Sequence, residues 1–422
     1  MALSQFSSFS GGAVSQHIAE ELLMIAKKAV VFQQIAEKAV MPSGEGKTFQ
    51  FNRYERLNLP QSVLTEGTAP TSTDMSLSTV SAVADQWGAF VEISDVALLT
   101  IKHPLLNVAM DLLGYQAAEL VDREIIKILL ASTNVTYGGA ITSRQNLATV
   151  STDSLSDATV QKVITHLRTQ GAHPYEGVHY VGVIDPGMEQ DVSASANTSF
   201  VNASAYGNAK QLYNGEIGTW RGVRWMTSNL IPKLAGLAAA TYTTPTSPVG
   251  TFAAANYTVT TEYVSKATGL VEKYTADTAI AFAAADSLAG TTPSDTNYTY
   301  KIYIGIAGAA AGTVMYQGSA TTYLFDGIPA STAFSILAPP TSGTTAQAIP
   351  GSGKTVHFGW VFGKQAFAAV DLMNLKAYVS DGKAIVGDPL AQKRTVGYKL
   401  MFKPVIQNQN FLERIEALSA YE

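Results

Sequence analysis

Residues 47–54 read Lys-Thr-Phe-Gln-Phe-Asn-Arg-Tyr, an alternation of polar and apolar side chains that predicts an extended strand. The chain enters this stretch through Met41-Pro42-Ser43-Gly44, passes a tip rich in Ser, Thr, Pro and Gly at residues 59–78, and returns through residues 80–93. Loops of this length inside a compact domain are uncommon and are usually functional or disordered. Because an isolated two-stranded arm is at best marginally stable, we expect this arm to lie on a neighbouring copy of the same chain.

The composition favours a protein that buries much of its surface against other chains. Of 422 residues, 46% are hydrophobic and 14% are charged, against about 25% charged in typical globular proteins. The net charge of −5 argues against a dedicated nucleic-acid binder, which normally carries a basic domain or stripe. The absence of cysteine excludes disulfides, thiolate metal sites and cysteine nucleophiles. No run of about 18 apolar residues occurs, so we expect no membrane-spanning helix.

Periodic segments predict an α+β protein. Apolar residues at helical spacing predict helices at 15–39, at 105–131, where the helix would be about 40 Å long, and after Ser154-Leu155-Ser156-Asp157, which has a capping pattern. Gly171 is expected to end that third helix. Strands are predicted at 180–184, 221–227, 356–362, 393–402 and 410–417, with a short helix or strand at 365–372.

Residues 235–350 form a segment of different composition. Only nine of them carry charge, and Ala, Thr, Gly and Tyr dominate. Short alternating stretches, such as 257–263 and 298–304, are separated by turn residues. This pattern is typical of a small β-sandwich of the immunoglobulin-like kind. We interpret the segment as an insertion into a host domain that resumes at Thr355.

Two motifs suggest chemistry but lack the context that the chemistry needs. Gly351-Ser352-Gly353-Lys354-Thr355 resembles a phosphate-binding loop, but Ala348 occupies the position of its first glycine and a strand pattern follows where a helix is needed. His173, Glu176 and His179 lie close together, but Pro174 and neighbouring glycines predict an ordinary surface loop rather than a metal site. No residue is assigned a catalytic, cofactor-binding or metal-binding role.

Charged and aromatic residues supply the candidates for contacts between subunits. Lys47, Arg53 and Arg56 make the outgoing limb of the arm basic, and Glu66 lies at its tip. These side chains either form a solvated surface or form ion pairs with a neighbouring copy, which would set register as much as affinity. The full set of predicted contact residues is Lys47, Arg53, Arg56, Glu66, Trp87, Glu216, Arg221 and Arg224.

Six short motifs, in this order along the chain, resemble the major capsid proteins of tailed phages, and most closely the family typified by coliphage N4. Residues 64–70, Leu-Thr-Glu-Gly-Thr-Ala-Pro, are similar to that family's Leu-x-Glu-Gly-x-x-Pro at the arm tip. The others are Gln86-Trp87-Gly88, Asp185-Pro186, Gly215-Glu216-Ile217-Gly218, Asp388-Pro389-Leu390 and Val396-Gly397-Tyr398-Lys399. Together they span most of the chain outside the insertion, which the family does not account for.

The resemblance implies the α+β major capsid fold of tailed phages and herpesviruses, with a spine helix in its peripheral domain. The expected parts are an N-terminal arm (1–40), an extended loop (41–93), a peripheral domain (94–150 and 376–422), an axial domain (151–234 and 351–375) and the inserted immunoglobulin-like sandwich (235–350).

The function implied is structural, with no catalysis and no cofactor. Copies of the chain would form hexamers and pentamers of a virion capsid around double-stranded DNA, assembled in the host cytoplasm and locked without covalent crosslinks. Portal, scaffolding or cement proteins are possible partners, and no membrane is involved. Rival interpretations are an encapsulin-like nanocompartment shell, a nucleotide-binding enzyme that uses Lys354, and a β-rich adhesin.

Overall fold

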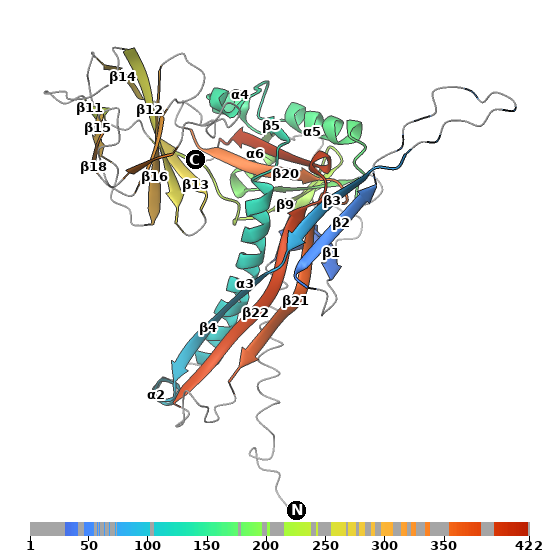
Figure 1. Cartoon of the computed structure of the whole chain (residues 1–422), viewed down its shortest axis with the longest axis vertical. Coiled ribbons are helices and arrows are strands. Elements are labelled where there is room, and N and C mark those ends of the chain that lie inside the picture. The colour runs from blue at the N-terminus through green and yellow to red at the C-terminus, as the bar shows by residue number, and fades with distance from the viewer. Residues whose placement is uncertain are drawn as a thin grey trace, which may run out of the picture. The chain divides into compact units, whose positions relative to one another are not determined.

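A computed structural model describes residues 30–40, 46–54, 57, 59, 63, 67, 72, 74–101, 105–175, 179–195, 201–202, 215–237, 242–243, 255–266, 269–275, 278–282, 288–291, 297–306, 314–318, 322–325, 334–337, 354–380 and 392–420. The chain divides into two compact units (Figure 1). Unit 1 comprises residues 1–131 and 364–409, and unit 2 comprises residues 132–363 and 410–422.

Unit 1 is built on a four-stranded sheet of order β1-β21-β22-β4. Its strands are β1 (Glu37–Val40), β21 (Phe367–Val379), β22 (Lys393–Ile406) and β4 (Asp85–Ser94). The other elements of this unit are η2 (Phe32–Gln34), β2 (Thr48–Tyr54), β3 (Leu77–Val83), α2 (Asp95–Thr100) and α3 (Leu105–Leu129).

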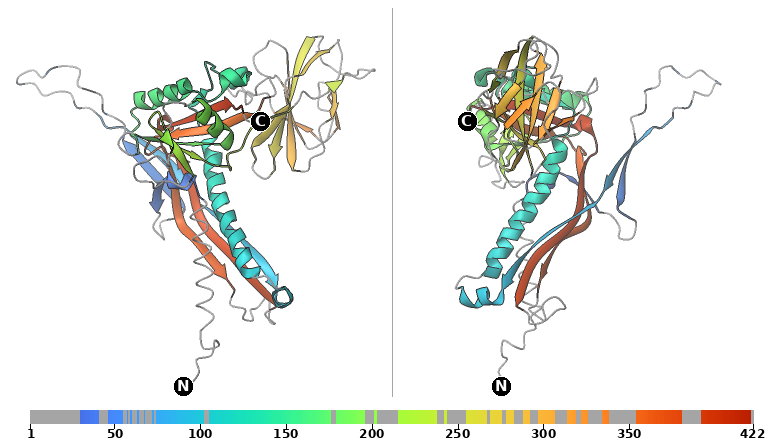
Figure 2. Two further views of the ribbon diagram at one scale, coloured as in Figure 1. Left: turned by 180° about the vertical axis from the view of Figure 1, so that it is seen from behind. Right: turned by 60° about the vertical axis from the view of Figure 1, so that its left-hand side comes forward.

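Helix α3 covers one face of this sheet, beside β22 and β4 (Figure 2). Its buried side includes the small residues Gly114, Ala117 and Ala118, which allow the helix backbone to approach the strands. The sheet contributes Val396, Tyr398 and Leu400, all buried. The predicted long helix is therefore confirmed, although it ends at Leu129.

The arm predicted around residues 47–54 is an antiparallel hairpin. Strands β2 and β3 pair from Thr48 opposite Val83 to Tyr54 opposite Leu77. The predicted extended loop of 41–93 is too long at its return end, because β4 pairs with β22 through ten consecutive residue pairs and belongs to the central sheet. The arm proper thus ends near Ala84, whose N–H donates to the Lys47 carbonyl at 2.9 Å.

The predicted helix at 15–39 is wrong over its described part, residues 30–39. There the chain forms the short turn η2 and then strand β1, which pairs in parallel with β21 from Glu37 opposite Ala368 to Val40 opposite Asp371. The preceding residues, 15–29, lie outside the described ranges. A distant strand edge thus overrides the local helical pattern.

Unit 2 contains a seven-stranded sheet of order β5-β23-β20-β6-β9-β8-β7. Its strands are β5 (Val135–Tyr137), β23 (Leu412–Leu418), β20 (Val356–Phe362), β6 (Tyr180–Ile184), β9 (Val223–Thr227), β8 (Glu216–Trp220) and β7 (Val201–Asn202). The helices are η3 (Arg144–Asn146), α4 (Val150–Asp153), α5 (Asp157–Thr169) and α6 (Pro186–Ser195), and η5 (Gln409–Phe411) precedes β23.

Helix α5 shows how local sequence sets an element of unit 2. Ser156 caps it, since its hydroxyl accepts from the Thr159 N–H at 3.4 Å. Val163 and Leu167 are fully buried in the core against Trp225. Gly171 follows the helix with a φ of +73°, a conformation that glycine adopts readily. The predicted helix, its start and its end are confirmed.

Most predicted strands of the sheets are also confirmed, with changed limits. Strands β6 and β20 have the predicted bounds, whereas β22 and β23 extend further toward the C-terminus. Of the segment 365–372, residues 367–372 belong to strand β21. Arg221 and Gly222, at positive φ, form the turn between β8 and β9 rather than the start of a strand.

The units differ from the predicted domain limits at the C-terminal side. Strand β21 is continuous in unit 1, whereas the predicted axial domain ended at residue 375. Strand β23 pairs with β20 in unit 2, whereas the predicted peripheral domain ran to residue 422. Long-range pairing decides both placements.

The described part of residues 235–337 is all-β. A seven-stranded sheet runs β10-β13-β12-β16-β17-β19, with β14 also on β12, and a second sheet runs β11-β15-β18. The strands are β10 (Ala235–Leu237), β11 (Tyr242–Thr243), β12 (Ala255–Ser265), β13 (Val271–Thr275), β14 (Thr278–Phe282), β15 (Leu288–Thr291), β16 (Tyr298–Ile306), β17 (Val314–Gly318), β18 (Thr322–Phe325) and β19 (Phe334–Leu337). Among the described helices, none is long and apolar enough to cross a membrane.

Candidate intersubunit surfaces

The base of the arm is covered by its own chain. Phe49 and Phe51 contact each other edge to face, with ring centroids 4.7 Å apart. They pack with Ala82 of β3 against a small cluster that includes Val370 and Val405 of the central sheet. The expectation that the arm's apolar face needs a neighbouring copy is therefore wrong for residues 48–54. The distal part of the arm remains available for such a contact.

The distal part of the arm exposes several large apolar side chains. Tyr54 and Leu77 form the last pair of the hairpin, and both are exposed. Further exposed residues in this region are Leu57, Leu59, Val63 and Met75. We call these six the arm-tip residues. Exposed apolar groups gathered on one element mark an interaction surface.

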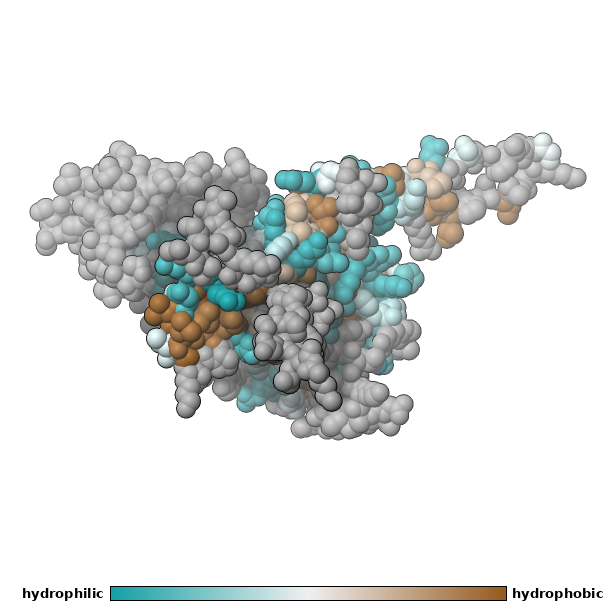
Figure 3. All heavy atoms as spheres, turned by 90° about the horizontal axis from the view of Figure 1, so that it is seen from below, coloured by the Kyte–Doolittle hydropathy of each residue, from teal (hydrophilic) through white to brown (hydrophobic). Residues whose placement is uncertain are grey.

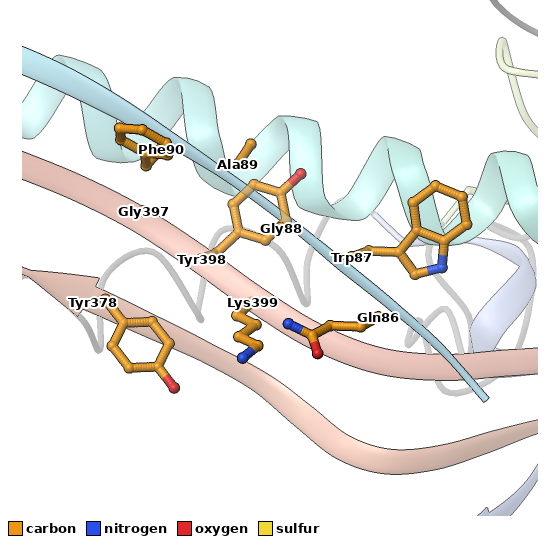
Figure 4. A pocket seen from close by; sticks show the side chains of 9 residues that line it. All are labelled: Gln86, Trp87, Gly88, Ala89, Phe90, Tyr378, Gly397, Tyr398 and Lys399. Atoms are coloured by element: carbon orange, nitrogen blue, oxygen red, sulfur yellow. The ribbon is translucent and has the colours of Figure 1, made fainter. Parts of the chain in front are cut away.

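The sheet face opposite α3 carries an open apolar pocket, which we call the sheet hollow (Figure 4). Gly397 lies in register between Phe90 of β4 and Tyr378 of β21, whose side chains are 66% and 54% exposed. A Cβ at Gly397 would come within 2.7 Å of the Phe90 Cβ, so glycine keeps the hollow open. The lining residues are Gln86, Trp87, Gly88, Ala89, Phe90, Tyr378, Gly397, Tyr398 and Lys399.

A third apolar surface covers α2 and the first turns of α3. Val96 and Leu99 of α2 are exposed, as are Ile101, Val108 and Leu112. Brown spheres gather over this end of unit 1 in Figure 3. Every large hydrophobic side chain found exposed among the described residues lies in unit 1. The large hydrophobic side chains in the described part of unit 2 are buried or half-buried.

The predicted contact residues of unit 1 occupy different environments. Lys47 is exposed at the base of the arm. Arg53 is half-buried and its Nη1 lies 3.5 Å from the Gln407 carbonyl oxygen of its own chain. Trp87 is half-buried and lines the sheet hollow. Arg56 and Glu66 lie outside the described residues.

The predicted contact residues of unit 2 interact within their own chain. Glu216 is only 2% exposed and its Oε1 lies 3.6 Å from Nη1 of Arg224. Arg221 forms a two-point ion pair with Asp157 at the start of α5, at 2.6 and 2.5 Å. The structure brings Glu216 and Arg224 together. Their role between subunits stays a prediction.

Sequence reasoning missed a buried ion pair in unit 2. Arg144 donates from Nε and Nη2 to both carboxylate oxygens of Glu416, each at 2.5 Å. Arg414 lies 2.9 Å from the same carboxylate. Burial alone would lower the pKa of Arg144, but the hydrogen bonds and charge of Glu416 outweigh it and raise that pKa. The 272 positions between the partners give no local sequence signal.

A buried histidine–aspartate pair has a structural role. Nδ1 of His357 lies 2.6 Å from Oδ2 of Asp185. The Asp185 carboxylate also accepts from the N–H groups of Gly187 and Met188, both at 3.2 Å, and so caps α6. Burial tends to raise the Asp185 pKa, but the hydrogen bond and charge of His357 outweigh it and hold that pKa below its ordinary value. Both side chains are buried, so substrate has no access to them.

The structure contradicts the phosphate-loop alternative where it can be examined. Lys354 is followed by strand β20, whereas a phosphate loop opens a helix. Residues 351–353 lie outside the described ranges, as does Glu176 of the histidine-rich loop. Within the described part of the chain, no group of three or more His, Asp or Glu side chains is placed to hold a metal ion.

Comparisons with known proteins follow this geometry. A family described as "Phage capsid protein" matches residues 77–272, slightly less than half of the chain. The capsid of Ralstonia phage GP4 is similar with a TM-score of 0.55 at 11% identity, over 93% of this chain and 92% of that chain. The capsid of cyanophage P-SCSP1u matches with a TM-score of 0.49 at 14% identity, over 93% and 89%. No curated protein matches the chain in sequence.

The likeness to the GP4 capsid shows a shared fold. The expectation of a tailed-phage capsid fold with mixed α and β structure is confirmed at this level. The family match and the fold together indicate a structural, non-enzymatic capsid protein of the phage kind.

Proposed function

We propose that the chain is the major capsid protein of a phage and self-assembles into an icosahedral shell. The observation that carries this proposal is the uneven distribution of exposed large apolar side chains, which among the described residues all lie in unit 1. Soluble monomers rarely expose apolar patches of this kind without a partner. The match to phage capsid proteins favours a virion shell over the nanocompartment alternative.

The contact that builds each ring joins the arm tip of one copy to the sheet hollow of the next. A ring of identical subunits needs two different, complementary surfaces on each copy, because its contacts are head to tail. The arm-tip residues provide one apolar surface, and Phe90 with Tyr378 provides the other. Lys399, which lines the hollow, offers a positive charge to Glu66 in the arm. Repetition around rings of six and five produces hexamers and pentamers.

The remaining features of the proposal rest on the resemblance in sequence. Unit 2 supplies the axial domain at the capsomer centre, unit 1 supplies the peripheral domain, and the first residues of the chain tie adjacent capsomers. The shell encloses double-stranded DNA without reading its sequence, which the net charge of −5 permits. Assembly takes place in the host cytoplasm, with portal, scaffolding or cement proteins as possible partners.

Two finer assignments belong to the same proposal. The motifs at 64–70 and 396–399 support relatives among N4-like phages. The two sheets of residues 235–337 support an immunoglobulin-like sandwich, which would face outward as a knob on the shell.

A shortened arm tests the proposed function. Tyr54 pairs with Leu77, so replacing residues 55–76 by Asn-Gly, which favours a two-residue hairpin turn, keeps β2, β3 and the packing of Phe49 and Phe51. We expect folded subunits that form no closed shells. Light scattering and negative-stain microscopy measure the outcome against wild-type particles.

A matched control changes the polar side of the same hairpin. Asn52 and Thr79 face each other there, with their side-chain oxygens 3.3 Å apart. The Asn52→Ala/Thr79→Ala variant should assemble as the wild type does. Normal shells from the shortened arm would refute the ring contact, and a wild type that stays monomeric would refute the capsid function itself.

A further inference from the structure

The lysines of strand β22 that share the face of the sheet hollow differ in their surroundings. Lys393, Lys399 and Lys403 are separated by even numbers of residues and therefore point to the same side of the sheet. Lys393 Nζ lies 3.1 Å from Oε2 of Glu92, and Lys403 Nζ lies 2.7 Å from Oδ2 of Asp85. Both carboxylates belong to β4, so the outer two lysines are neutralised within the subunit.

Lys399, which lies between them, has no such carboxylate. Its partner in register on β4 is Gly88. A Cβ at Gly88 would come within 2.7 Å of the Tyr398 carbonyl oxygen, so this position of β4 excludes any side chain, acidic ones included. Among the described residues, Lys399 forms no ion pair.

The neighbour of Lys399 on the other strand adds a second positive charge. Lys376 of β21 lies directly opposite Lys399 in the register, and the Lys399 side chain points toward β21 in Figure 4. Lys376 is exposed and also has no ion pair within the described part of the chain. Like charges directly opposite each other destabilise a sheet. These two residues, which we call the lysine pair, therefore favour a carboxylate supplied from outside the subunit.

The lysine pair adjoins exposed apolar side chains. Tyr378 and Gly397 each lie two residues along their strands from the lysine pair, and Phe90 lies opposite Gly397. Two residues of a strand span about 7 Å. A segment that complements this surface therefore carries an acidic residue within a few positions of apolar ones.

The return limb of the arm has this character. Asp74 is exposed and forms no hydrogen bond or ion pair among the described residues. Met75 and Leu77 follow it and are exposed, the second of them about 10 Å further along an extended chain. Tyr54 pairs with Leu77 and adds a third exposed apolar side chain. The arm thus carries the charge that the lysine pair lacks, beside apolar groups that match the hollow.

We propose that Asp74 of one copy forms ion pairs with Lys376 and Lys399 of the next copy. The proposal rests on the ring contact between the arm tip and the sheet hollow, and it adds the charges that set the register of that contact. Two ammonium groups accommodate two carboxylates, so this pairing is compatible with the contact between Lys399 and Glu66. A wholly apolar partner would leave the repulsion within the lysine pair uncompensated.

Lys376→Glu tests the lysine pair in two opposite directions. The new carboxylate lies opposite Lys399, so the unassembled subunit should show a higher urea midpoint by circular dichroism than the wild type. The same variant should assemble about tenfold more slowly, because Asp74 then approaches a negative charge. A lower urea midpoint would show that Lys376 is already stabilised within its own chain and would overturn the proposal.

An exchange of charges tests the partner. Asp74→Lys alone should slow shell formation in low salt about tenfold by light scattering, because like charges then meet. Asp74→Lys/Lys376→Glu should return the rate to within about threefold of the wild type, because opposite charges meet again. The matched control, Asp74→Lys/Lys393→Glu, changes a lysine of the same face that Glu92 already neutralises, and it should stay as slow as Asp74→Lys.

The remaining outcomes separate this pairing from the proposed function. No recovery in Asp74→Lys/Lys376→Glu, or equal recovery in the control, would overturn the pairing, while wild-type shells that the shortened arm cannot form would still support the ring contact. A wild type that stays monomeric would refute both. The rival occupant is nucleic acid. Salt-dependent binding of a labelled double-stranded oligonucleotide to unassembled wild-type subunits, lost in Lys376→Glu, would reassign the lysine pair to phosphate.

Discussion

The sheets of the two units bury their strands in opposite ways. In unit 2, strands β6, β20 and β23 are buried at every position. In unit 1, the distal half of β21 alternates between half-buried and exposed residues, and β4 has no buried position. The sheet of unit 2 has its apolar residues covered by its own unit. The sheet of unit 1 is covered by α3 on one face and carries the sheet hollow on the other.

This difference separates stability from assembly. Unit 2 contains buried ion pairs and a core that includes Trp220 and Trp225, so its free energy of unfolding depends on contacts within one chain. Unit 1 leaves apolar groups exposed, so part of their stabilisation becomes available only when another chain covers them. We expect substitutions in unit 2 to act on folding and surface substitutions in unit 1 to act on association.

The largest effect on folding is expected from Glu416→Gln. The variant leaves the guanidinium groups of Arg144 and Arg414 buried without their shared counter-charge, which costs about 3–5 kcal/mol of unfolding free energy. Urea unfolding followed by tryptophan fluorescence measures this loss, because Trp220, Trp225 and Trp360 are all buried in unit 2. A loss below about 1 kcal/mol would mean that the pair behaves like a surface pair and would weaken the contrast between the units.

The next largest effect is expected from Asp122, which makes the free energy of unfolding depend on pH. Burial raises the pKa of this carboxyl from 3.8 to about 6, although three backbone N–H groups oppose the shift. Because the folded state binds the proton of Asp122 more tightly than the unfolded state does, protonation stabilises the fold below pH 4. This stabilisation is lost as the pH rises through 6. The free energy of unfolding changes by about 3 kcal/mol in total.

Asp122→Asn should remove this pH dependence, since its side chain does not titrate. Unfolding by urea, followed by circular dichroism between pH 4 and pH 8, compares the two proteins. Parallel pH profiles for wild type and variant would show that Asp122 titrates as an ordinary carboxyl. The stability contribution attributed to the buried Asp122 carboxyl would then be incorrect.

Phe90→Glu should leave folding almost unchanged and still prevent shell formation. The side chain is mostly exposed at the rim of the sheet hollow, so the isolated subunit loses no buried contact and the change should be within about 0.5 kcal/mol. A charge in the hollow would oppose docking of apolar arm-tip residues. A destabilised subunit, or shells of normal size by light scattering, would contradict the division between folding and assembly.

The smallest effect is expected from Arg221→Ala, the control for Glu416→Gln. The ion pair of Arg221 with Asp157 has good geometry, but both side chains are substantially exposed, and exposed pairs contribute little. Alanine tolerates the positive φ of this position no better than arginine, so only the ion pair changes. The urea midpoint should match that of the wild type. A clear decrease would show that surface charges also support unit 2.

Local patterns in the sequence were sufficient for several elements. Val163 and Leu167 recur at helical spacing in α5, and Ser156 and Gly171 mark its ends. Short runs rich in apolar residues indicated β6 and β20. The alternation at 47–54 indicated the arm, and its tip motif indicated the capsid fold. In each case the signal lies within about 20 residues, where the periodicity of one element is readable.

The candidate surfaces were less accessible to such reasoning. Lys47 and Trp87 lie at surfaces where a contact is possible, whereas Glu216 is buried against Arg224 of its own chain. Nothing in the sequence around Gly397 shows that Phe90 and Tyr378 flank it, because these residues belong to three different strands. The hollow exists only through the register of those strands.

The sequence by itself determined which segments are helical or extended, that an arm projects from unit 1, and which family of shells the chain resembles. The tertiary structure alone decided what covers each apolar face. Glu37–Val40 became a strand because β21 offered an edge, and Phe49 and Phe51 found cover on Val370 and Val405. The pattern of apolar side chains shows which residues must be buried. The residues that cover them are set by contacts with segments hundreds of positions away in the sequence.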